Sequence, residues 1–558
     1  MMDNDSTPKN TQARAPWFFS LLAALALVGV IAACWRKIDV SEVLFHLRAG
    51  QVIEHTDQIP NRDIFSATSS VGIWVYFEWL WASALAWAFA AGKWAGINGV
   101  TIGLATVTSA LLIARNRLAD TKLFESLVIV TAVMIALLPG FQPTPLTAAL
   151  PLFALALIMT EARRWRWPMI AFPAVAAIWA NVSISAPLVL LIPIARFIFP
   201  DGFDNRTIMP IRRNFFGLII IAGLLGLSVN PHSIRAFTAW WHTAGVLASE
   251  APLHLAAAFL DSAFLLQAAL AIAMITLTVA GRAFTKCQMA AGTVLLASIV
   301  FISPHAVRFL LIFLAAPAAT GLAVLLRRTW EGPASVRMIA GAALLIACVA
   351  WFACTAAVAR LMPDAFGKGI RAHVFPETAA GRLAAIPMRA TVFHQKKDAE
   401  YLTWRLWPDW KTSIDDRPGF YDHNFLSQYE KVWQGGQRWQ ELFQAWRVNA
   451  VVGNRDVSAR YPKHNLFDEL ADSEEWQAVY WDSLSIVYLR KGIDVSATNF
   501  EPFRVLKPGL TWAEMNDRIK SPDMWRELTA DLRRAVQDAP ENTDAVEFLR
   551  RAQQHTTP

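Results

Sequence analysis

The feature that most constrains this chain is a series of apolar segments, which begins at Trp17 and ends at residue 359. Most of them approach the length of about 20 residues that a helix needs to cross the hydrocarbon core of a bilayer. The sequence therefore predicts an α-helical polytopic membrane domain over residues 17–359. The expected spans are 17–35, 99–114, 124–140, 145–160, 168–183, 184–199, 214–230, 260–281, 286–303, 307–326 and 337–359.

The composition agrees with a membrane protein that carries a soluble part. Of the 558 residues, 55% are hydrophobic and 17% are charged. The net charge of +7 does not indicate nucleic-acid binding, because most of the basic excess lies in short loops between apolar segments. All four cysteines lie in apolar segments, so a disulfide framework in the soluble part is excluded. The chain has no Walker motif, no HExxH and no GxGxxG after a strand, so nucleotide hydrolysis, zinc proteolysis and dinucleotide redox chemistry lack support.

Basic residues gather in alternate loops, and this asymmetry predicts the orientation of the spans. The loops around Arg115 and Arg163, and every second loop up to Arg337, are expected to face the cytoplasm. The polar lead 1–16 is then cytoplasmic, and about eleven spans (range 10–13) carry the chain to the outer side. No cleavage site follows the first apolar run, so we expect a retained helix. Counting Glu78–Gly92 as a span breaks the alternation, so we expect a partly inserted or membrane-hugging helix there.

A polar stretch, Lys37–Trp81, interrupts the apolar half of the chain directly after the first expected span. Its charged residues are costly at membrane depth, so the external loop 36–81 must lie at the interface or line a wet cavity. Residues 40–55 have the apolar spacing of an interfacial helix, which places Glu42 and His46 on one face. Acids held against a membrane suit chemistry on a lipid-linked substrate, and they equally suit a solvated structural loop.

The loop reads D-x-x-E-x-x-x-H-L-x-x-G-x-x-I, then I-P-N-R-D-x-F-S and W-x-x-x-E-W-L. This order resembles the first external loop of bacterial polytopic glycosyltransferases of the GT-C class, which are related to the dolichyl-phosphate-mannose mannosyltransferases. Glu42 stands where the family has its second acid, whereas Asp39 is one residue out of register with the first. Leu44 and Phe45 replace a Trp pair, and Ile64 replaces a Pro. The matching residues are His46, Leu47, Gly50, Ile59, Pro60, Asp63, Phe65, Ser66, Trp74, Glu78, Trp79 and Leu80.

Four later motifs resemble the family and lie on the same predicted side of the membrane. Residues 140–144, G-F-Q-P-T, stand where the family has R-P-Q. Residues 179–181 resemble the start of W-A-N-x-H-G, without the His-Gly. Asn230-Pro231-His232 resembles N-P-Y. Residues 303–313, with Arg308 as the cation, resemble the helix start R-[NH]-x-P-L-F.

Hydropathy falls after Arg360, and the sequence predicts a soluble α/β domain at 360–500 and a helical tail at 501–558. Residues 401–417 resemble the family's Y-L-x-W-x-L-x-P-x-x-K-x-x-I-D-G-R, with Asp398-Ala-Glu in place of a small Gly-Gly turn. We expect the charged trio 415–417 to dock the soluble domain on the membrane half. The expected strands are 390–393, 411–414, 449–453, 476–480 and 485–490, and the expected helices are 429–446, 511–535 and 541–554.

The resemblance implies a transferase that needs an acid to deprotonate or orient the acceptor, and cations for the departing phosphate. Its catalytic acid is carried over to Glu42 as first choice and Asp39 as second; alternatively, Glu42 only pairs with Arg36 or Arg48. Structural alternatives remain for the other candidates: a hydrogen-bonded histidine, a capping acid, or an arginine at lipid headgroups. A divalent ion stays open, since some GT-C enzymes need one. The residues expected to bind substrate or phosphate are His46, Asp63, Glu78, His232, Arg235, His305 and Arg308.

The implied function is transfer of a hexosyl or pentosyl group from a polyprenyl-phosphate-linked donor to an envelope lipid, glycan or protein. The implied place is a bacterial inner membrane, with the C-terminal domain outside the cytoplasm. One alternative is a catalytically silent scaffold in envelope polysaccharide assembly, which the lost acid register and the missing His-Gly favour. Another is a transporter of lipid-linked sugar, which predicts paired repeats of broken helices.

Overall fold

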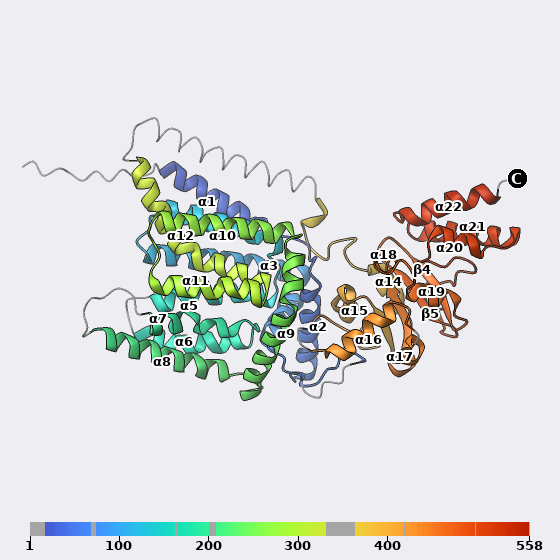
Figure 1. Cartoon of the computed structure of the whole chain (residues 1–558), viewed down its shortest axis with the longest axis horizontal. Helices are drawn as coiled ribbons and strands as arrows, with labels where there is room; N and C mark the ends of the chain where they lie inside the picture. The colour runs from blue at the N-terminus through green and yellow to red at the C-terminus, as the bar shows by residue number, and fades with distance from the viewer. Residues whose placement is uncertain are drawn as a thin grey trace, which may run out of the picture. The chain divides into compact units, whose positions relative to one another are not determined.

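The computed structural model describes residues 17–68, 74–161, 166–199, 208–330, 363–417, 420–436, 438–496 and 498–556 (Figure 1). The expected lead 1–16 and the expected span 337–359 lie outside the described residues. The chain divides into two compact units. The helical unit consists of Met1–Lys37 and Phe77–Gly369, and the sheet unit of Ile38–Tyr76 and Ile370–Pro558. The domain boundaries predicted at residues 17, 360 and 501 stay predictions.

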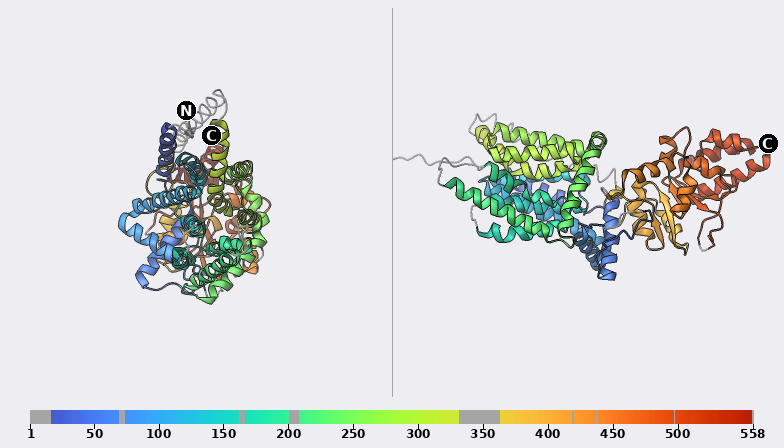
Figure 2. Two further views of the ribbon diagram at one scale, coloured as in Figure 1. Left: turned by 90° about the vertical axis from the view of Figure 1, so that its left-hand side faces the viewer. Right: turned by 60° about the horizontal axis from the view of Figure 1, so that its bottom comes forward.

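The helical unit is built from apolar helices, most of which run side by side (Figures 1 and 2). Large apolar side chains are exposed on it, among them Trp87, Trp241 and Leu260. An apolar surface of this kind is expected where lipid replaces water. The helices are α1 (Trp17–Ala32), α3 (Trp79–Leu118), α4 (Leu123–Leu137), α5 (Pro145–Glu161), α6 (Arg166–Ala180), α7 (Leu191–Ile198), α8 (Ile208–Ser228), α9 (Ile234–Ala258), α10 (Ser262–Ala280), α11 (Lys286–Phe301) and α12 (Val307–Trp330).

Four described helices are long and apolar enough to cross a membrane: Trp79–Leu118, Leu123–Gly140, Ser262–Ala280 and Pro304–Thr329. Shorter apolar helices are Trp17–Ala32, Pro145–Glu161, Ile170–Ala180, Ala186–Ile198, Arg213–Ser228 and Lys286–Phe301. The predicted apolar helical architecture is therefore confirmed, whereas the bounds of the membrane domain and the number of about eleven spans stay predictions.

Helix α3 contains a sharp break at Lys93, where φ is 50°. The break brings Gly96 against the Ala88 carbonyl oxygen, which would lie only 1.9 Å from a Cβ atom at this position. A glycine is required for such a close approach of two backbones. The segment Glu78–Gly92 is predicted as a partly inserted or membrane-hugging helix, and its residues 79–92 form the first part of α3. Their depth in a membrane stays a prediction.

Arg115 stabilises the interior of the helical unit. Its guanidinium binds Glu161 through Nε (2.9 Å) and Nη2 (2.8 Å), and donates from Nη1 to the carbonyls of Ile312 and Phe313. Pro317 lies in α12 and has no N–H to bond the Phe313 carbonyl four residues earlier. Arg115 supplies the missing donor where water is excluded.

The sheet unit contains a five-stranded sheet with the order β2-β1-β3-β5-β4. Strand β1 is parallel to β2 and β3, while β5 is antiparallel to β3 and β4. The strand bounds are β1 (Ala390–His394), β2 (Trp410–Thr412), β3 (Val448–Gly453), β4 (Trp476–Trp481) and β5 (Ile486–Arg490). All five predicted strands are thereby confirmed to within two residues at each end.

Helices cover this sheet and form the tail, and two of the predicted helices are wrong in extent. The expected helix 429–446 is two helices separated by a turn, because Gly435 adopts φ +70°. The expected helix 511–535 is likewise divided. The helices are α2 (Ser41–Thr56), α14 (Glu377–Ala384), α15 (Ala399–Leu406), α16 (His423–Trp433), α17 (Trp439–Ala445), α18 (Asp456–Arg460), α19 (Leu466–Asp472), α20 (Trp512–Arg518), α21 (Pro522–Asp538) and α22 (Thr543–Thr556).

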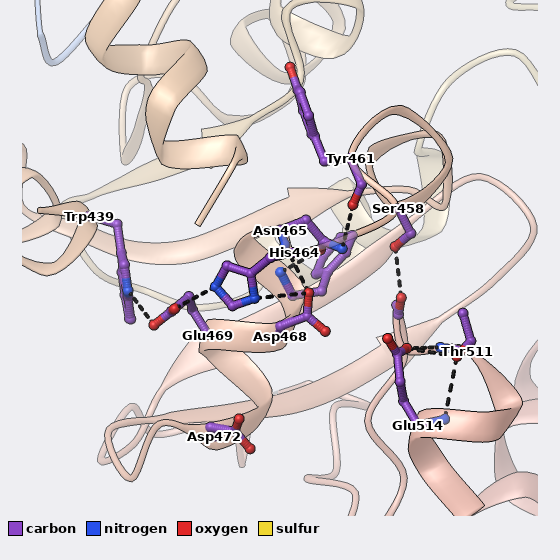
Figure 3. A network of polar contacts seen from close by, with 12 residues as sticks. Trp439, Ser458, Tyr461, His464, Asn465, Asp468, Glu469, Asp472, Thr511 and Glu514 are labelled. Atoms are coloured by element: carbon purple, nitrogen blue, oxygen red, sulfur yellow. Dashed lines mark hydrogen bonds and ion pairs between the residues drawn. The ribbon is translucent and has the colours of Figure 1, made fainter. Parts of the chain in front are cut away.

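A polar network joins α17, α19 and the segment between them (Figure 3). Glu469 accepts from Trp439 Nε1 (3.0 Å) and lies 2.7 Å from Nε2 of His464. Asn465 and Asp468 form a capping box at the start of α19. The network fixes these two helices to each other within the sheet unit.

Candidate active site

The external loop extends the sheet at β2. Ser66 forms a parallel bridge with Thr412, and the Ala67 N–H donates to the Thr412 carbonyl (2.9 Å). Trp407 Nε1 donates to the Ile64 carbonyl (3.1 Å). These bonds pair the free edge of β2, which a lone C-terminal domain would expose. The candidate acids Asp39, Glu42 and Asp63 therefore belong to one compact body with residues 370–558, whereas Glu78 belongs to the helical unit.

Helix α2 carries Glu42 and His46, and the C-terminal residues hold it in two places. The Ser41 hydroxyl donates to Glu400 Oε2 (3.1 Å). Arg48 donates from Nε to the Trp404 carbonyl (3.0 Å), which lies in the last turn of α15. The helix predicted at 40–55 is confirmed, and its buried face includes Val43, Leu44, Phe45, Leu47, Ala49 and Val52.

Glu42, His46 and Tyr76 form a polar row, which we call the Glu42 row. Oε1 of Glu42 lies 3.7 Å from Nε2 of His46, and Nδ1 of His46 lies 2.8 Å from the Tyr76 hydroxyl. The Glu42 side chain is 49% exposed, whereas that of His46 is 6% exposed. The carboxylate of Glu42 is therefore accessible to solvent, and the buried imidazole of His46 lies next to it. Such an acid can accept a proton from a substrate and remain oriented.

Of the predicted alternatives for Glu42, the pairing with Arg48 is not found within the sheet unit, and the pairing with Arg36 stays a prediction. Arg48 donates to the Trp404 carbonyl, and Arg36 donates to the Leu138 carbonyl (3.1 Å). Asp39, the second choice for the catalytic acid, is 3.5 Å from Arg371 and only 17% exposed. Glu42 is thus the more accessible of the two acids.

Asp63 lies in a buried charge cluster with Asp415 and Arg417. Arg417 binds Asp415 through Nε (2.8 Å) and Nη2 (2.6 Å), and Nη2 is 3.0 Å from Asp63. Burial opposes the charge of Arg417, but the two carboxylates outweigh it and hold the pKa of the guanidinium above its ordinary value. Asp63 also accepts from the Phe65 N–H (3.0 Å), which agrees with the predicted turn-capping role. The trio 415–417 is predicted to dock on the membrane half; within the sheet unit, Arg417 binds the external loop.

Glu400 is a buried acid beside this cluster, which sequence reasoning missed. It accepts from the Ser41 hydroxyl and from the Asp416 N–H (3.0 Å). Burial raises the pKa of Glu400 to about 8, and the charges of Asp416 and Asp415 add to the effect. The only signal in the sequence was the Asp398-Ala-Glu departure from the family's Gly-Gly turn. Tyr76 carried no signal at all.

In the helical unit, two of the quoted motifs meet at the start of α3. The Asn181 side chain accepts from Trp79 Nε1 (2.6 Å) and from Asn230 Nδ2 (3.2 Å). Asn230 in turn accepts from the His232 N–H (2.9 Å). Glu78 is the N-cap residue of α3 but makes no capping hydrogen bond with its side chain. The asparagines thus have a structural role that fixes the positions of Glu78 and His232.

Arg308 lies against Gly140, so two further motifs meet in the helical unit. A Cβ atom at Gly140 would lie 2.4 Å from Nη2 of Arg308, so a larger residue there would displace the end of the Arg308 side chain. His305 belongs to a short turn whose N-cap is Ser303. Arg235 is exposed at the start of α9. Substrate contact by these residues stays a proposal.

The described residues do not supply a complete ligand set for a divalent metal. Within these ranges, no group of three or more His, Cys, Asp or Glu side chains is placed to hold an ion. Glu42 and His46 would give two ligands, while Asp39 is directed to Arg371. Catalytic sites of this kind use at least three protein or substrate ligands. We therefore derive no step through a metal.

Comparison with solved structures finds an archaeal transferase among the similar chains. The chain is similar to the archaeal oligosaccharyltransferase AglB from Archaeoglobus fulgidus in complex with an inhibitory peptide and a dolichol-phosphate. The identity is 9% and the TM-score 0.51, over 97% of this chain and 84% of that one. The chain shares the overall fold of this transferase. A second structure is the oligosaccharyltransferase of the same organism in the apo form, with 11% identity and a TM-score of 0.49, over 87% and 78% of the two chains. No family model and no curated protein matches.

The shared fold is consistent with the fold expected from the loop motifs and with the apolar helices that are long enough to cross a membrane. At this level of identity the likeness establishes the fold alone. The bacterial origin and the relation to the mannosyltransferases stay predictions. The roles of individual residues must be argued from the site itself.

Proposed function

We propose that this protein is a membrane glycosyltransferase, which moves a sugar from a polyprenyl-phosphate-linked donor to a lipid, glycan or protein acceptor of the cell envelope. The observation that carries the proposal is the Glu42 carboxylate, half exposed on α2 and supported by His46. The shared fold supports the same reaction class. The proposed mechanism is direct displacement with inversion.

In this mechanism the oxygen of an acceptor hydroxyl, or the nitrogen of an acceptor amide, attacks the anomeric carbon of the sugar. Glu42 accepts the proton that this oxygen or nitrogen loses. The bond between the anomeric carbon and the phosphate oxygen breaks, and the electron pair leaves with the polyprenyl phosphate. Charge that develops on the phosphate needs cations or donors. We propose Arg308, with its planar fork of donors, as the first of these, supported by His305, His232 and Arg235. Glu78 is proposed to contact the acceptor.

The position of His46 and Asp63 in the motif implied that they bind substrate. Their contacts in the structure fit a positioning role better. Both ring nitrogens of His46 already face protein groups, the Tyr76 hydroxyl and Glu42. Asp63 is 3% exposed and paired with Arg417. We propose that both residues position Glu42 within the sheet unit. Asp39 is proposed as a secondary acid, released when Arg371 turns to substrate.

The partners proposed are a polyprenyl-phosphate sugar and an acceptor of the envelope. AglB was captured with an inhibitory peptide and a dolichol-phosphate, which supports a lipid phosphate and a protein acceptor as kinds of ligand for this fold. The resemblance of the loop motifs supports a bacterial inner membrane, and the alternation of basic loops supports an orientation with residues 360–558 outside the cytoplasm.

A catalytically silent scaffold is the second candidate. The pairing of Asp39 with Arg371 favours it, because this position is one residue out of register with the family's first acid and is only 17% exposed. A scaffold needs the fold and the envelope partners but no accessible acid.

The test is transfer of radiolabelled sugar from polyprenyl-phosphate donors by the membrane-embedded full chain. Glu42→Gln should lower kcat by about 10²-fold or more, as expected for loss of a general base. Asp39→Asn should have a smaller effect. Glu54→Gln is the matched control, because Glu54 is an exposed acid on the same helix. If the unaltered chain transfers no sugar, yet its deletion changes the envelope glycan, the scaffold is the better interpretation.

A further inference from the structure

Tyr76 is the innermost member of the Glu42 row and takes no direct part in the proposed transfer. We propose that Tyr76 is a positioning residue, which fixes the proton of His46 on Nε2 and so orients the Glu42 carboxylate. The inference rests on the proposed function of Glu42, whereas the state of the imidazole can be measured without any substrate.

The geometry places the phenol and the imidazole in one hydrogen-bonded arrangement. The Tyr76 hydroxyl is 2.8 Å from Nδ1 of His46, and the two rings are nearly parallel, with 4° between their planes. Tyr76 is 1% exposed and His46 is 5% exposed, so water competes little for this bond. A buried bond of this length couples the orientation of the Tyr76 hydroxyl to the tautomer of the His46 ring.

The direction of the bond follows from the chemistry of the two groups. A phenol hydroxyl donates readily, and an unprotonated imidazole nitrogen is a strong acceptor. If Tyr76 donates to Nδ1, the neutral ring carries its proton on Nε2. Nε2 lies 3.7 Å from Oε1 of Glu42, which is longer than a hydrogen bond but close enough for a polar N–H to attract the carboxylate. The opposite tautomer would direct a lone pair at that carboxylate.

Tyr76 is itself held by aromatic packing. Its ring stacks on Trp74 with 4.4 Å between centroids, and the guanidinium of Arg417 lies 4.6 Å from the centre of that indole. The charge cluster of Arg417 thereby fixes Trp74, and Trp74 fixes the phenol. A hydroxyl that cannot move away from Nδ1 keeps one tautomer populated.

The consequence for transfer concerns the two oxygens of Glu42. The Nε2–H of His46 is directed at one oxygen, which leaves the other for the proton of the acceptor. In this arrangement Glu42, and not His46, takes up the proton of the acceptor. Without the Tyr76 hydroxyl, part of the His46 population would carry its proton on Nδ1, and Glu42 would lose its orientation.

The direct test is ¹⁵N NMR of the full chain in lipid bilayers, labelled at the histidine rings. His46 is assigned from the signals that disappear in His46→Gln. The expected spectrum of the unaltered chain shows His46 protonated at Nε2 and not at Nδ1, and Tyr76→Phe should mix the two tautomers. Protonation at Nδ1 in the unaltered chain, or an unchanged His46 spectrum in Tyr76→Phe, overturns the inference.

Kinetics give the second measurement. Tyr76→Phe should lower kcat about 10-fold with little change in KM, less than the 10²–10⁴-fold that a general base itself contributes. Tyr488→Phe is the matched control, since it also removes a buried hydroxyl, which donates to the Pro508 carbonyl (2.9 Å). Equal losses in both variants would mean a structural effect only. If Glu42→Gln keeps full activity, Glu42 is not the general base, and the NMR result still decides the tautomer.

Discussion

Arg115 in the helical unit and Arg417 in the sheet unit are both buried, but they balance charge in different ways. Arg115 binds one carboxylate, Glu161, and two backbone carbonyls. Arg417 binds two carboxylates, Asp63 and Asp415, and packs on the ring of Phe420 at 3.7 Å. The first set is neutral, whereas the second keeps one surplus negative charge.

The difference shows what each unit requires of a buried cation. In the helical unit, the cation repairs a backbone defect made by Pro317 in a medium without water. In the sheet unit, it joins residues 63 and 415, which come from distant parts of the sequence. The surplus charge stays close to Glu400. Burial raises the pKa of Glu400 to about 8, and the neighbouring charges of Asp416 and Asp415 add to this effect. Three predictions test this contrast.

The largest effect is expected from Arg417→Met, which leaves two buried carboxylates without a cation. Loss of one partner of a buried pair costs about 3–5 kcal/mol, so the sheet unit should unfold at a much lower temperature. Asp63→Asn should cost under about 1 kcal/mol, because the Arg417–Asp415 pair stays neutral and the new amide oxygen can still accept from the Phe65 N–H. Thermal unfolding of the purified full chain measures both.

Arg438→Met is the control for that series, because Arg438 is 81% exposed in its pair with Glu441 and should change little. An Arg417→Met protein as stable as Asp63→Asn would show that Arg417 does not hold the loop on the sheet.

A smaller effect is expected in the helical unit. Arg115→Met should cost about 3 kcal/mol, and adding Glu161→Gln should restore part of it, because the double variant leaves no unpaired charge. For Arg417→Met, neutralising either Asp63 or Asp415 alone should not restore stability in the same way, because the other aspartate remains buried without a cation. The measurement is a double-mutant cycle on thermal stability in detergent. Additive losses at Arg115 and Glu161 would contradict the neutral pair.

The smallest effect is a pH dependence from Glu400. Its pKa is about 8 in the folded chain and near 4.5 when unfolded, so the folded state binds the extra proton between these values. Stability should therefore fall as pH rises from about 5 to 8 and level off above. Glu400→Gln should flatten this slope and raise the unfolding temperature at pH 8. An unchanged slope would mean that other groups, such as the buried Asp398, cause it.

Local patterns predicted much of this molecule. The apolar periods indicated the helical unit and the five strands, and the four-residue spacing placed Glu42 and His46 on one face of α2. Such signals depend on residues close in sequence, where backbone geometry alone sets neighbours.

The parts that could not be predicted depend on pairing across long distances. Nothing near Asp63 points to Arg417, and nothing near Ser41 points to Glu400, because each contact joins segments separated by the whole helical unit. Tyr76 occupies a variable position of the motif W-x-x-x-E-W-L, so the motif does not indicate a role for it. The division of 429–446 depended on the positive φ of Gly435, which a helical period cannot reveal.

The pairing of the loop with β2 also has a consequence in time. Thr68 bonds the carbonyl of Ser413, 345 residues later in the chain. At a synthesis rate of about 5–20 residues per second, the loop waits roughly 20–70 seconds for its partner strand to be made. During this interval the side chains of Phe65 and Trp74, buried in the finished protein, have no sheet unit to cover them. The cell must therefore shield a nascent apolar surface outside the first helix, and slow translation or loss of a shielding chaperone should favour aggregation of this early segment.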